Sequence, residues 1–391
     1  MCMKKYNTDG VVSRPAVRSD AGFTDIVILA GGVGERLWSA STKAHPKQFI
    51  KAFGEHSFFQ MAVSRALALK PSGVIMVITR REFVDIAAAE CASFASSLPE
   101  AERLFLESAL VIFGEPEPRH TAAAVECACM FSRSIYDSVD GRTMLVLTSD
   151  HIIKPETMFV ASCGAALNSV RGDRFVCFGI TPDFPATGFG YIKTDGYASE
   201  SDSALAVRSF HEKPDEKTAR TYIAEGNCWW NSGMFAFMES HYLAEINRFV
   251  PELSAAFEPL AASKPELSLK QNIRVIQKWS GLEWAYLASP SISIDNAVAE
   301  KTAYASCVPA AFSWSDVGNW DAFVQSIPCP MHNIVNVESD DCSVYSDIPV
   351  ALCGVSGLIV VIQDGQALIL KKGKSDLVRD AVRQIALCNN G

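Results

Sequence analysis

Three glycines and two cations follow a short apolar run near the N-terminus, and together they could bind the phosphates of a nucleotide. The run is Ile26–Leu29, and a buried parallel strand is predicted there. A glycine turn after such a strand lets backbone N–H groups approach phosphate closely. Arg36 and Lys47 place positive charge beside the turn. These features predict binding of a nucleoside triphosphate and chemistry on it. The glycines are Gly31, Gly32 and Gly34.

Two better-known phosphate loops do not fit this stretch. A P-loop needs a lysine followed by serine or threonine after its second glycine, and residues 32–37 lack that lysine. The dinucleotide-binding fingerprint needs a third glycine where this chain has Leu37. A P-loop kinase and an ordinary dehydrogenase are therefore poorly supported. The structural alternative is a plain strand-to-helix turn.

Two aspartates that follow other segments could hold a metal ion. Mg²⁺ prefers one or two carboxylates together with phosphate oxygens. Asp150 follows an apolar run and could be one ligand, although it could equally cap the next helix. Asp316, between Trp314 and Trp320, could complete the site or lie in a tight turn among tryptophans.

Further residues have the chemistry of a sugar-phosphate pocket. Lys213 suits a phosphate as a point charge, and Glu212 can accept hydrogen bonds from sugar hydroxyls. Asn231 follows two tryptophans, and aromatic side chains with polar groups often line sugar pockets. Gly190 would let a backbone approach a ligand. Taken singly, each of these motifs has a commoner structural explanation: a solvated turn for Glu212 and Lys213, a buried aromatic cluster around Asn231 and a hairpin at Gly190. The prediction therefore depends on how many such motifs occur and on their order along the chain.

The elements that position these residues follow an alternating pattern. From about residue 24 to 180, apolar runs alternate with Ala-rich amphipathic segments. This alternation predicts an α/β fold with a doubly wound, mainly parallel, Rossmann-like sheet, whose ligands bind beyond the carboxyl ends of strands. A hairpin-rich insertion is expected over 186–240 and a mostly helical segment over 241–285. Strands are expected at 26–29, 74–78, 110–113, 144–147 and 175–178, and helices at 57–69, 81–97, 121–135 and 156–170.

The composition is that of a globular protein. Of 391 residues, 49% are hydrophobic and 20% charged, and the net charge of −9 disfavours a broad nucleic-acid-binding surface. No apolar run reaches membrane-spanning length, and the N-terminus lacks the apolar core of a signal peptide. Twelve scattered cysteines favour buried thiols in a reducing compartment. We therefore expect a cytoplasmic protein without nucleic-acid or membrane partners.

Seven ordered segments closely resemble the signature of the mannose-1-phosphate guanylyltransferases, which are sugar nucleotidyltransferases. The resemblance spans about residues 24–325 and continues more weakly beyond. It implies that GTP and α-mannose 1-phosphate give GDP-mannose and pyrophosphate, with Mg²⁺, by in-line attack on the α-phosphorus. The segments read GGVGERLWSAS…PKQ, TSDH, TGFGYI, EKPD, WNSGMF, SIDNAVAEK and WSDVGNW.

The resemblance also implies roles on the nucleotide side. Arg36 would steady the leaving pyrophosphate, and Lys47 would act on the α-phosphate or the negative charge of the transition state. Arg119 and Thr121 would lie near the base. The nucleotide loop itself would consist of Gly31, Gly32 and Gly34.

On the sugar side, the resemblance assigns the mannose phosphate to Lys213. Asp150 and Asp316 would hold Mg²⁺ across the two substrates. The sugar hydroxyls would be read by Glu212, Asn231 and the backbone of Gly190.

Four residues depart from the family pattern. Ser39, Ala123 and Thr148 stand where relatives commonly have prolines, and His120 stands where they have asparagine. None of these changes removes a charged residue that the chemistry requires. Two alternatives stay open: another sugar-1-phosphate nucleotidyltransferase, acting on heptose or glucose 1-phosphate, and a catalytically silent sugar-nucleotide sensor.

We expect three parts along the chain: a flexible leader over 1–22, a nucleotidyltransferase domain over 23–328 and a small β-rich domain over 329–391. Bifunctional bacterial relatives add a phosphomannose isomerase domain of the cupin type. The last part is too short for such a domain, and His332 is its only histidine. Its strands and a final helix around 375–387 could support a homodimer.

Overall fold

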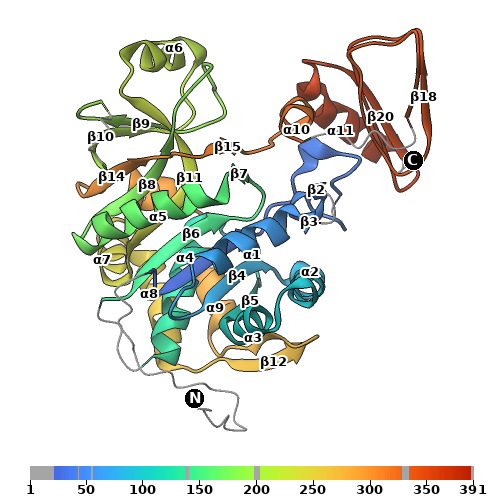
Figure 1. Ribbon diagram of the computed structural model, residues 1–391. Helices are drawn as coiled ribbons and strands as arrows, with labels where there is room; N and C mark the ends of the chain where they lie inside the picture. The colour runs from blue at the N-terminus through green and yellow to red at the C-terminus, as the bar shows by residue number, and fades with distance from the viewer. Residues whose placement is uncertain are drawn as a thin grey trace. The chain divides into compact units, whose positions relative to one another are not determined.

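The computed structural model describes residues 22–42, 44–53, 56–136, 141–197, 203–327 and 334–388. The expected leader, His332 and the expected boundary near 328 lie almost wholly outside these residues. Two compact units are present (Figure 1). The first contains the described residues up to Gly31 together with Val63–Thr148 and Lys154–Ser313; the second contains Gly32–Ala62, Ser149–Ile153 and the residues from Trp314 onward.

An eleven-stranded sheet forms the centre of the first unit (Figure 1). Its order is β12 (Glu266–Lys270), β13 (Ile273–Lys278), β5 (Leu110–Glu115), β4 (Ile75–Arg80), β1 (Asp25–Ala30), β6 (Thr143–Thr148), β11 (Cys228–Met238), β8 (Phe175–Ile180), β14 (Ala305–Pro309), β10 (Leu205–His211) and β9 (Tyr191–Thr194). Strands β13, β5, β4, β1 and β6 are parallel to one another along this order, which confirms the expected α/β architecture. Strand β11 is antiparallel to both β6 and β8, so the complete sheet is mixed.

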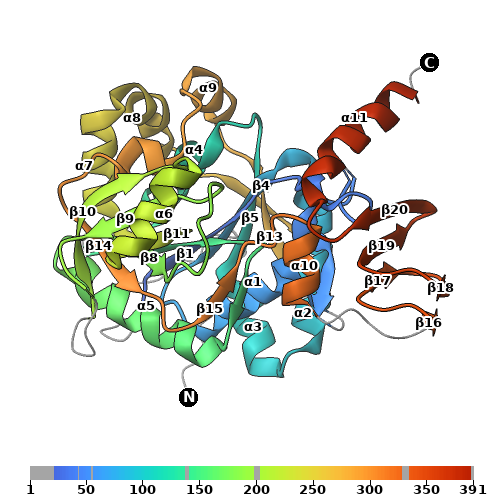
Figure 2. The same cartoon turned by 90° about the horizontal axis from the view of Figure 1, so that it is seen from above.

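Helices cover both faces of this sheet, as right-handed crossovers require. Figure 2 shows α5 (Glu156–Arg171) on one face, and α4 (His120–Ile135), α7 (Glu239–Phe249) and α8 (Pro251–Phe257) on the other. The expected helices are confirmed within a few residues as α1 (Phe58–Ala68), α2 (Val84–Ser97), α4 and α5. Helix α3 (Glu100–Ala109) was not expected, whereas α9 (Leu282–Ala288) begins within the expected helical segment and extends three residues beyond it.

Helix α4 is buried on nearly all sides, and most of its buried residues are apolar or small. One residue conflicts with this apolar environment. Glu126 has no exposed surface, and neither of its carboxylate oxygens has a hydrogen-bond partner among the described residues. Burial raises the pKa of Glu126 to about 8, with Arg133 opposing the shift and Glu239 reinforcing it.

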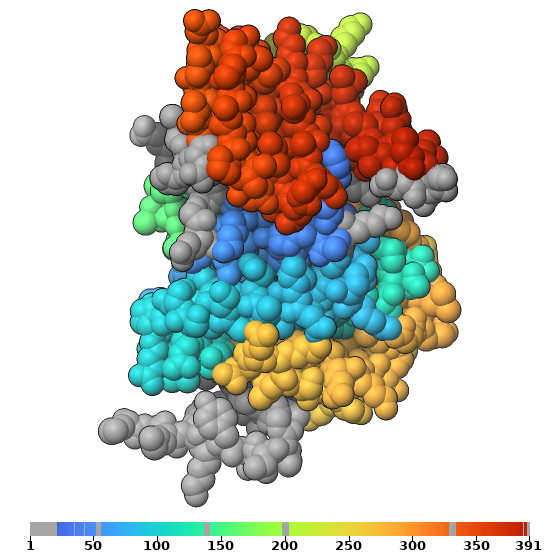
Figure 3. Space-filling view, turned by 90° about the vertical axis from the view of Figure 1, so that its right-hand side faces the viewer, coloured from blue at the N-terminus to red at the C-terminus, as the bar shows by residue number. Residues whose placement is uncertain are grey.

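The expectation of a mostly helical segment over 241–285 is wrong for residues 266–278. These residues form the antiparallel hairpin β12–β13, which lies beside α2 and α3 (Figure 3). Gln271 and Asn272 both have positive φ, as a tight two-residue hairpin turn requires. The expected insertion also contains a helix, α6 (Glu216–Glu225), which is capped by the Asp215 side chain.

The second unit is built around a separate core. Phe58, Trp320 and Phe323 are fully buried there beside residues of the last strands. Strand β16 (Ile334–Val337) is parallel to β18 (Val350–Cys353), and β17 (Ser343–Ser346) is parallel to β19 (Leu358–Gln363). The expected β-rich C-terminal part is thus confirmed. The unit also contains β2 (Lys51–Phe53), β3 (His56–Ser57), α10 (Trp320–Ser326), β20 (Gln366–Lys371) and α11 (Val378–Cys388); β7 (Ile152–Lys154) pairs with β15 (Ser313–Ser315).

The ten cysteines among the described residues are free thiols, and seven of them are buried, in line with the expectation of buried thiols. Within the same residues, no helix combines the length and the apolar character needed to cross a membrane.

Candidate active site

The predicted site residues fall into both units, and each group is described by itself. The first unit contains Gly31, Arg119, Thr121, Gly190, Glu212, Lys213 and Asn231; the second contains Gly32, Gly34, Arg36, Lys47, Asp150 and Asp316.

The glycine loop of the second unit packs directly on Lys47. Gly34 has φ +74°, and a Cβ atom there would lie 2.3 Å from the Cβ of Lys47. The backbone N–H of Lys47 donates to the carbonyl of Val33 at 3.1 Å, and Ser41 Oγ donates to the same carbonyl at 2.6 Å. Only glycine combines this backbone conformation with so close an approach. Arg36 lies in the short helix η1 (Glu35–Leu37), with its side chain exposed.

Lys47 joins three distant segments of the sequence. Its side chain is almost completely buried, and Nζ donates to Asp150 Oδ2 at 2.8 Å and to the backbone carbonyl of Asp316. Burial acts to raise the pKa of Asp150, but the positive charge of Lys47, helped by His151, outweighs it and holds that pKa below its usual value. Asp150 is therefore a carboxylate at neutral pH, and Lys47 is an ammonium held in a fixed position.

Asp150 and Asp316 offer the oxygen chemistry that Mg²⁺ prefers. Their side chains supply two carboxylates within one unit, which is the number of protein ligands usual for Mg²⁺ bound to substrate phosphates. Among the described residues there is no group of three or more acidic, histidine or cysteine side chains that could enclose a metal alone. The donor set thus fits an ion that is shared with phosphate oxygens.

His151 and Trp314 also belong to this cluster, although we did not predict them as site residues. Trp314 Nε1 donates to His151 Nδ1 at 3.1 Å. His151 Nε2 lies 3.6 Å from Asp150 Oδ1. The histidine directly after Asp150 in the sequence was the available signal, but its tryptophan partner lies 163 positions away.

In the first unit, Glu212, Lys213 and Gly190, which were all predicted for the sugar site, lie close together. Lys213 Nζ lies 2.8 Å from Glu212 Oε1. A Cβ atom on Gly190 would lie 2.6 Å from Glu212 Oε2, so the missing side chain makes room for that carboxylate. Asn231 adjoins Gly190, because its N–H donates to the Gly190 carbonyl at 2.8 Å.

Sequence reasoning missed a second acidic member of this group, Asp295. Asn231 Nδ2 donates to Asp295 Oδ1 at 2.8 Å. Burial, followed by the negative charge of Glu212, raises the pKa of Asp295 to about 6. The signal was its place in the segment SIDNAVAEK, but nothing local in that segment points to Asn231.

Arg119 and Thr121 are held by the backbone at the end of α9 and beyond it. Arg119 Nε donates to the carbonyl of Tyr286 at 2.8 Å, and Thr121 Oγ1 accepts from the N–H of Ile294 at 2.9 Å. Glu115 lies at the end of β5 and accepts a hydrogen bond from the Tyr286 hydroxyl at 3.2 Å. Burial raises the pKa of Glu115 to about 7, against the opposing effects of Tyr286 and Arg80.

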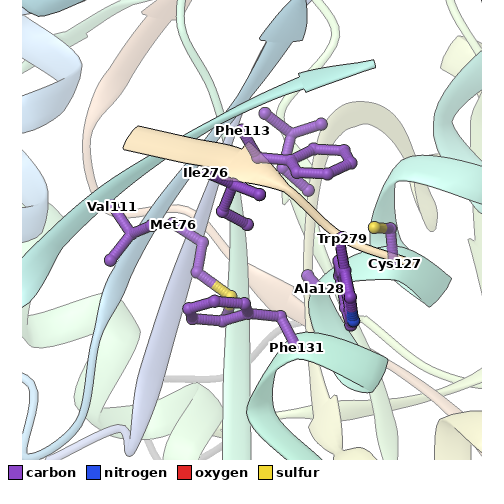
Figure 4. Close-up of a pocket in the computed structure, with 9 residues that line it drawn as sticks. Met76, Val111, Phe113, Cys127, Ala128, Phe131, Ile276 and Trp279 are labelled. Atoms are coloured by element: carbon purple, nitrogen blue, oxygen red, sulfur yellow. The ribbon is translucent and has the colours of Figure 1, made fainter. Parts of the chain in front are cut away.

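The first unit also contains an apolar pocket, shown in Figure 4, that does not suit a substrate. Its volume is only about 10 Å³, which is scarcely room for one water molecule, and its lining offers no charged group. The pocket is a packing defect among core side chains. It is lined by Met76, Ile78, Val111, Phe113, Cys127, Ala128, Phe131, Ile276 and Trp279.

Comparisons with known proteins match both parts of the chain. The nucleotidyl transferase family matches residues 25–328, and the mannoseP isomerase/GMP-like beta-helix domain matches residues 332–385. The mannose-1-phosphate guanylyltransferase of Escherichia coli (strain K12) is 33% identical over 370 residues, which are 92% of this chain and 73% of that protein. The xanthan biosynthesis protein XanB of Xanthomonas campestris pv. campestris (strain B100) is 33% identical over 92% of this chain and 72% of its own length.

A solved structure agrees with these matches. A crystal structure described as a mannose-1-phosphate geranyltransferase from Thermus thermophilus has a TM-score of 0.75 and 26% sequence identity to this chain. The match covers 93% of this chain and all of that one.

Proposed function

Because this chain belongs to the nucleotidyl transferase family, we propose that it is a mannose-1-phosphate guanylyltransferase. The reaction joins GTP and α-mannose 1-phosphate into GDP-mannose and releases pyrophosphate. The observation that carries the proposal is the buried Lys47 ammonium, which Asp150 and the Asp316 carbonyl hold in place. Such a fixed charge suits a reaction whose negative charge develops on phosphate oxygens.

The chemistry needs positioning more than proton transfer. The phosphate oxygen of the sugar is already anionic at neutral pH, so its attack on the α-phosphorus requires no general base. A lysine ammonium has three N–H donors, and Asp150 and Asp316 account for two of them in the structure. The third can be given to an α-phosphate oxygen, where it would stabilise the charge of the in-line transition state.

The remaining residues of the second unit would act on the rest of the triphosphate. Backbone N–H groups of the loop at Gly32 and Gly34 would bind phosphate oxygens, and Gly31 of the first unit would do the same. The exposed Arg36 would steady the pyrophosphate as it leaves. Asp150 and Asp316 would hold Mg²⁺, which neutralises phosphate charge when bound.

In the first unit, Lys213 would bind the phosphate of mannose 1-phosphate, and Glu212 and the Gly190 backbone would meet the sugar hydroxyls. Asn231 would contribute from the same cluster. Arg119 and Thr121 would shape the base site, through the backbone segment that both of them hold. We further propose that the protein works in the cytoplasm and could form a homodimer.

The test is pyrophosphate release by the purified chain with Mg²⁺, using GTP, ATP, UTP and CTP, each with mannose, glucose and heptose 1-phosphates. Release confined to GTP and mannose 1-phosphate is expected. Release with another pair would preserve the mechanism but replace the substrate. A folded protein that binds GDP-mannose without turnover would be a sensor, and the proposal would be wrong.

A further inference from the structure

Asp295 is a carboxylate in the sugar-side cluster to which the reaction scheme above assigns no role. It begins η5 (Asp295–Ala299), a π-helical turn, and such turns are rare and often found at functional sites. Another element anchors the start of this turn, because the Ile294 N–H donates to Thr121 Oγ1 at 2.9 Å. Contacts from two other elements, α4 and β11, thus place Asp295.

Both polar atoms of the Asn231 side-chain amide make hydrogen bonds to other residues of the protein. Nδ2 donates to Asp295 Oδ1 at 2.8 Å, and Oδ1 accepts from the N–H of Gly233 at 3.2 Å. Gly233 has φ +73° and lies where the pairing of β11 with β8 is irregular. The Asn231 side chain is thus bound to its own strand through Oδ1 and to Asp295 through Nδ2, so it can orient that carboxylate.

Glu212 belongs to the same short chain of contacts. Its carboxylate lies against Gly190, and the Gly190 carbonyl accepts from the N–H of Asn231. Two carboxylates, Glu212 and Asp295, are therefore linked through two residues, and Lys213 lies beside Glu212. Ionised carboxylates only accept hydrogen bonds, whereas sugar hydroxyls donate them, so two carboxylates of one cluster suit two hydroxyls of one sugar.

We propose that Asp295 and Glu212 form a pair of acceptors that reads two hydroxyls of the sugar phosphate, with Asn231 as a positioning residue for Asp295. The inference rests on the proposed function, since it takes the sugar phosphate to bind beside Lys213. A sugar that lacks one of these hydroxyls would leave a carboxylate without its donor, which is a strong basis for rejection.

The first test compares Asp295→Asn with Glu300→Gln. Glu300 is a matched control, because it is an exposed carboxylate of the same segment that also accepts from an asparagine amide, Asn296 Nδ2, at 2.9 Å. For Asp295→Asn we expect a 10- to 100-fold loss of affinity for mannose 1-phosphate by calorimetry, with the KM for GTP within twofold of wild type. Glu300→Gln should leave both quantities within twofold. Unchanged sugar affinity in Asp295→Asn, or an equal loss for both substrates, would overturn the proposal.

Deoxy analogues of mannose 1-phosphate test the pairing in the wild-type chain, including the case in which Asp295→Asn does not fold. In the wild type, removal of either of two hydroxyls should weaken binding at least tenfold. For one of these two hydroxyls, the Asp295→Asn variant should bind the deoxy analogue and mannose 1-phosphate equally well. A wild type that is indifferent to every deoxygenation refutes the acceptor pair. Failure of the proposed function can be distinguished from failure of the acceptor pair. If the proposed function were wrong, the wild type would bind or turn over another sugar phosphate, and the deoxy series of that sugar would then test the pair.

Discussion

Replacing Glu126 by glutamine should stabilise the fold at neutral and alkaline pH. The side chain is completely buried in α4 without a hydrogen-bond partner among the described residues, and its pKa in the fold is about 8 against an ordinary 4.5. The folded state therefore binds a proton that the unfolded chain releases. For a carboxyl whose pKa is raised by folding, stability falls as pH rises from about 4.5 to about 8.

The magnitude follows from the size of the shift. Each pKa unit corresponds to about 1.4 kcal/mol, so between pH 5 and pH 8 this group should cost the wild type about 3 kcal/mol of unfolding free energy. Glutamine keeps the shape and does not ionise. The stability of Glu126→Gln relative to wild type should therefore rise by about 3 kcal/mol over that range.

Urea unfolding of both proteins at pH 5, 6, 7 and 8 measures this difference directly. Glu258→Gln removes an exposed carboxylate of the same unit and is measured beside it as the control for the substitution itself. If the difference for Glu126→Gln were flat across this range, the carboxylate would be charged or solvated in the fold, and the reasoning from burial would be refuted.

Three further changes test the second unit. Lys47→Ala should lower kcat by at least about 100-fold while the protein still unfolds near the wild-type melting temperature, because the charge acts mainly in the transition state. Normal turnover by this variant would show that Lys47 has no part in the mechanism. Asp316→Asn should shift the Mg²⁺ titration of activity to higher concentration, and an unchanged titration would show that the carboxylate does not hold the metal. Gly34→Ala should destabilise the unit by more than about 1 kcal/mol in thermal unfolding, because its Cβ would collide with Lys47 and its φ is positive. Gly32→Ala, which meets no atom within 4 Å, is its control, and equal effects of the two changes would contradict the packing argument.

Patterns within short stretches of the sequence correctly predicted the central strands and most of the helices between them. The apolar runs behind β1, β4, β5, β6 and β8 are short and separated by helical segments, so alternation alone indicated the parallel strands. The hairpin β12–β13 was missed because its strands are partly exposed at the edge of the sheet and carry charged residues. An edge strand needs less apolar surface than a central one, and its periodic signal is correspondingly weak.

Several residues predicted to form the site lie close together in the structure, and each of them belongs to a recognisable sequence motif. Lys47, Asp150 and Asp316 each lie in a recognisable segment, and the structure brings them together. Trp314 and Asp295 were missed as site residues because their roles depend on partners 163 and 64 positions away. A single sequence does not record such pairs, since only the folded backbone brings them into contact.

The Lys47 cluster also fixes an order of events during synthesis. The carbonyl that accepts from Lys47 belongs to a residue 269 positions later in the chain. At translation rates of about 5–20 residues per second, the nascent lysine waits roughly 15 to 50 s for that acceptor to be made. During this interval Lys47 Nζ lacks one of its two acceptors. The packing of the glycine loop on Lys47 is therefore complete only after synthesis has passed Asp316.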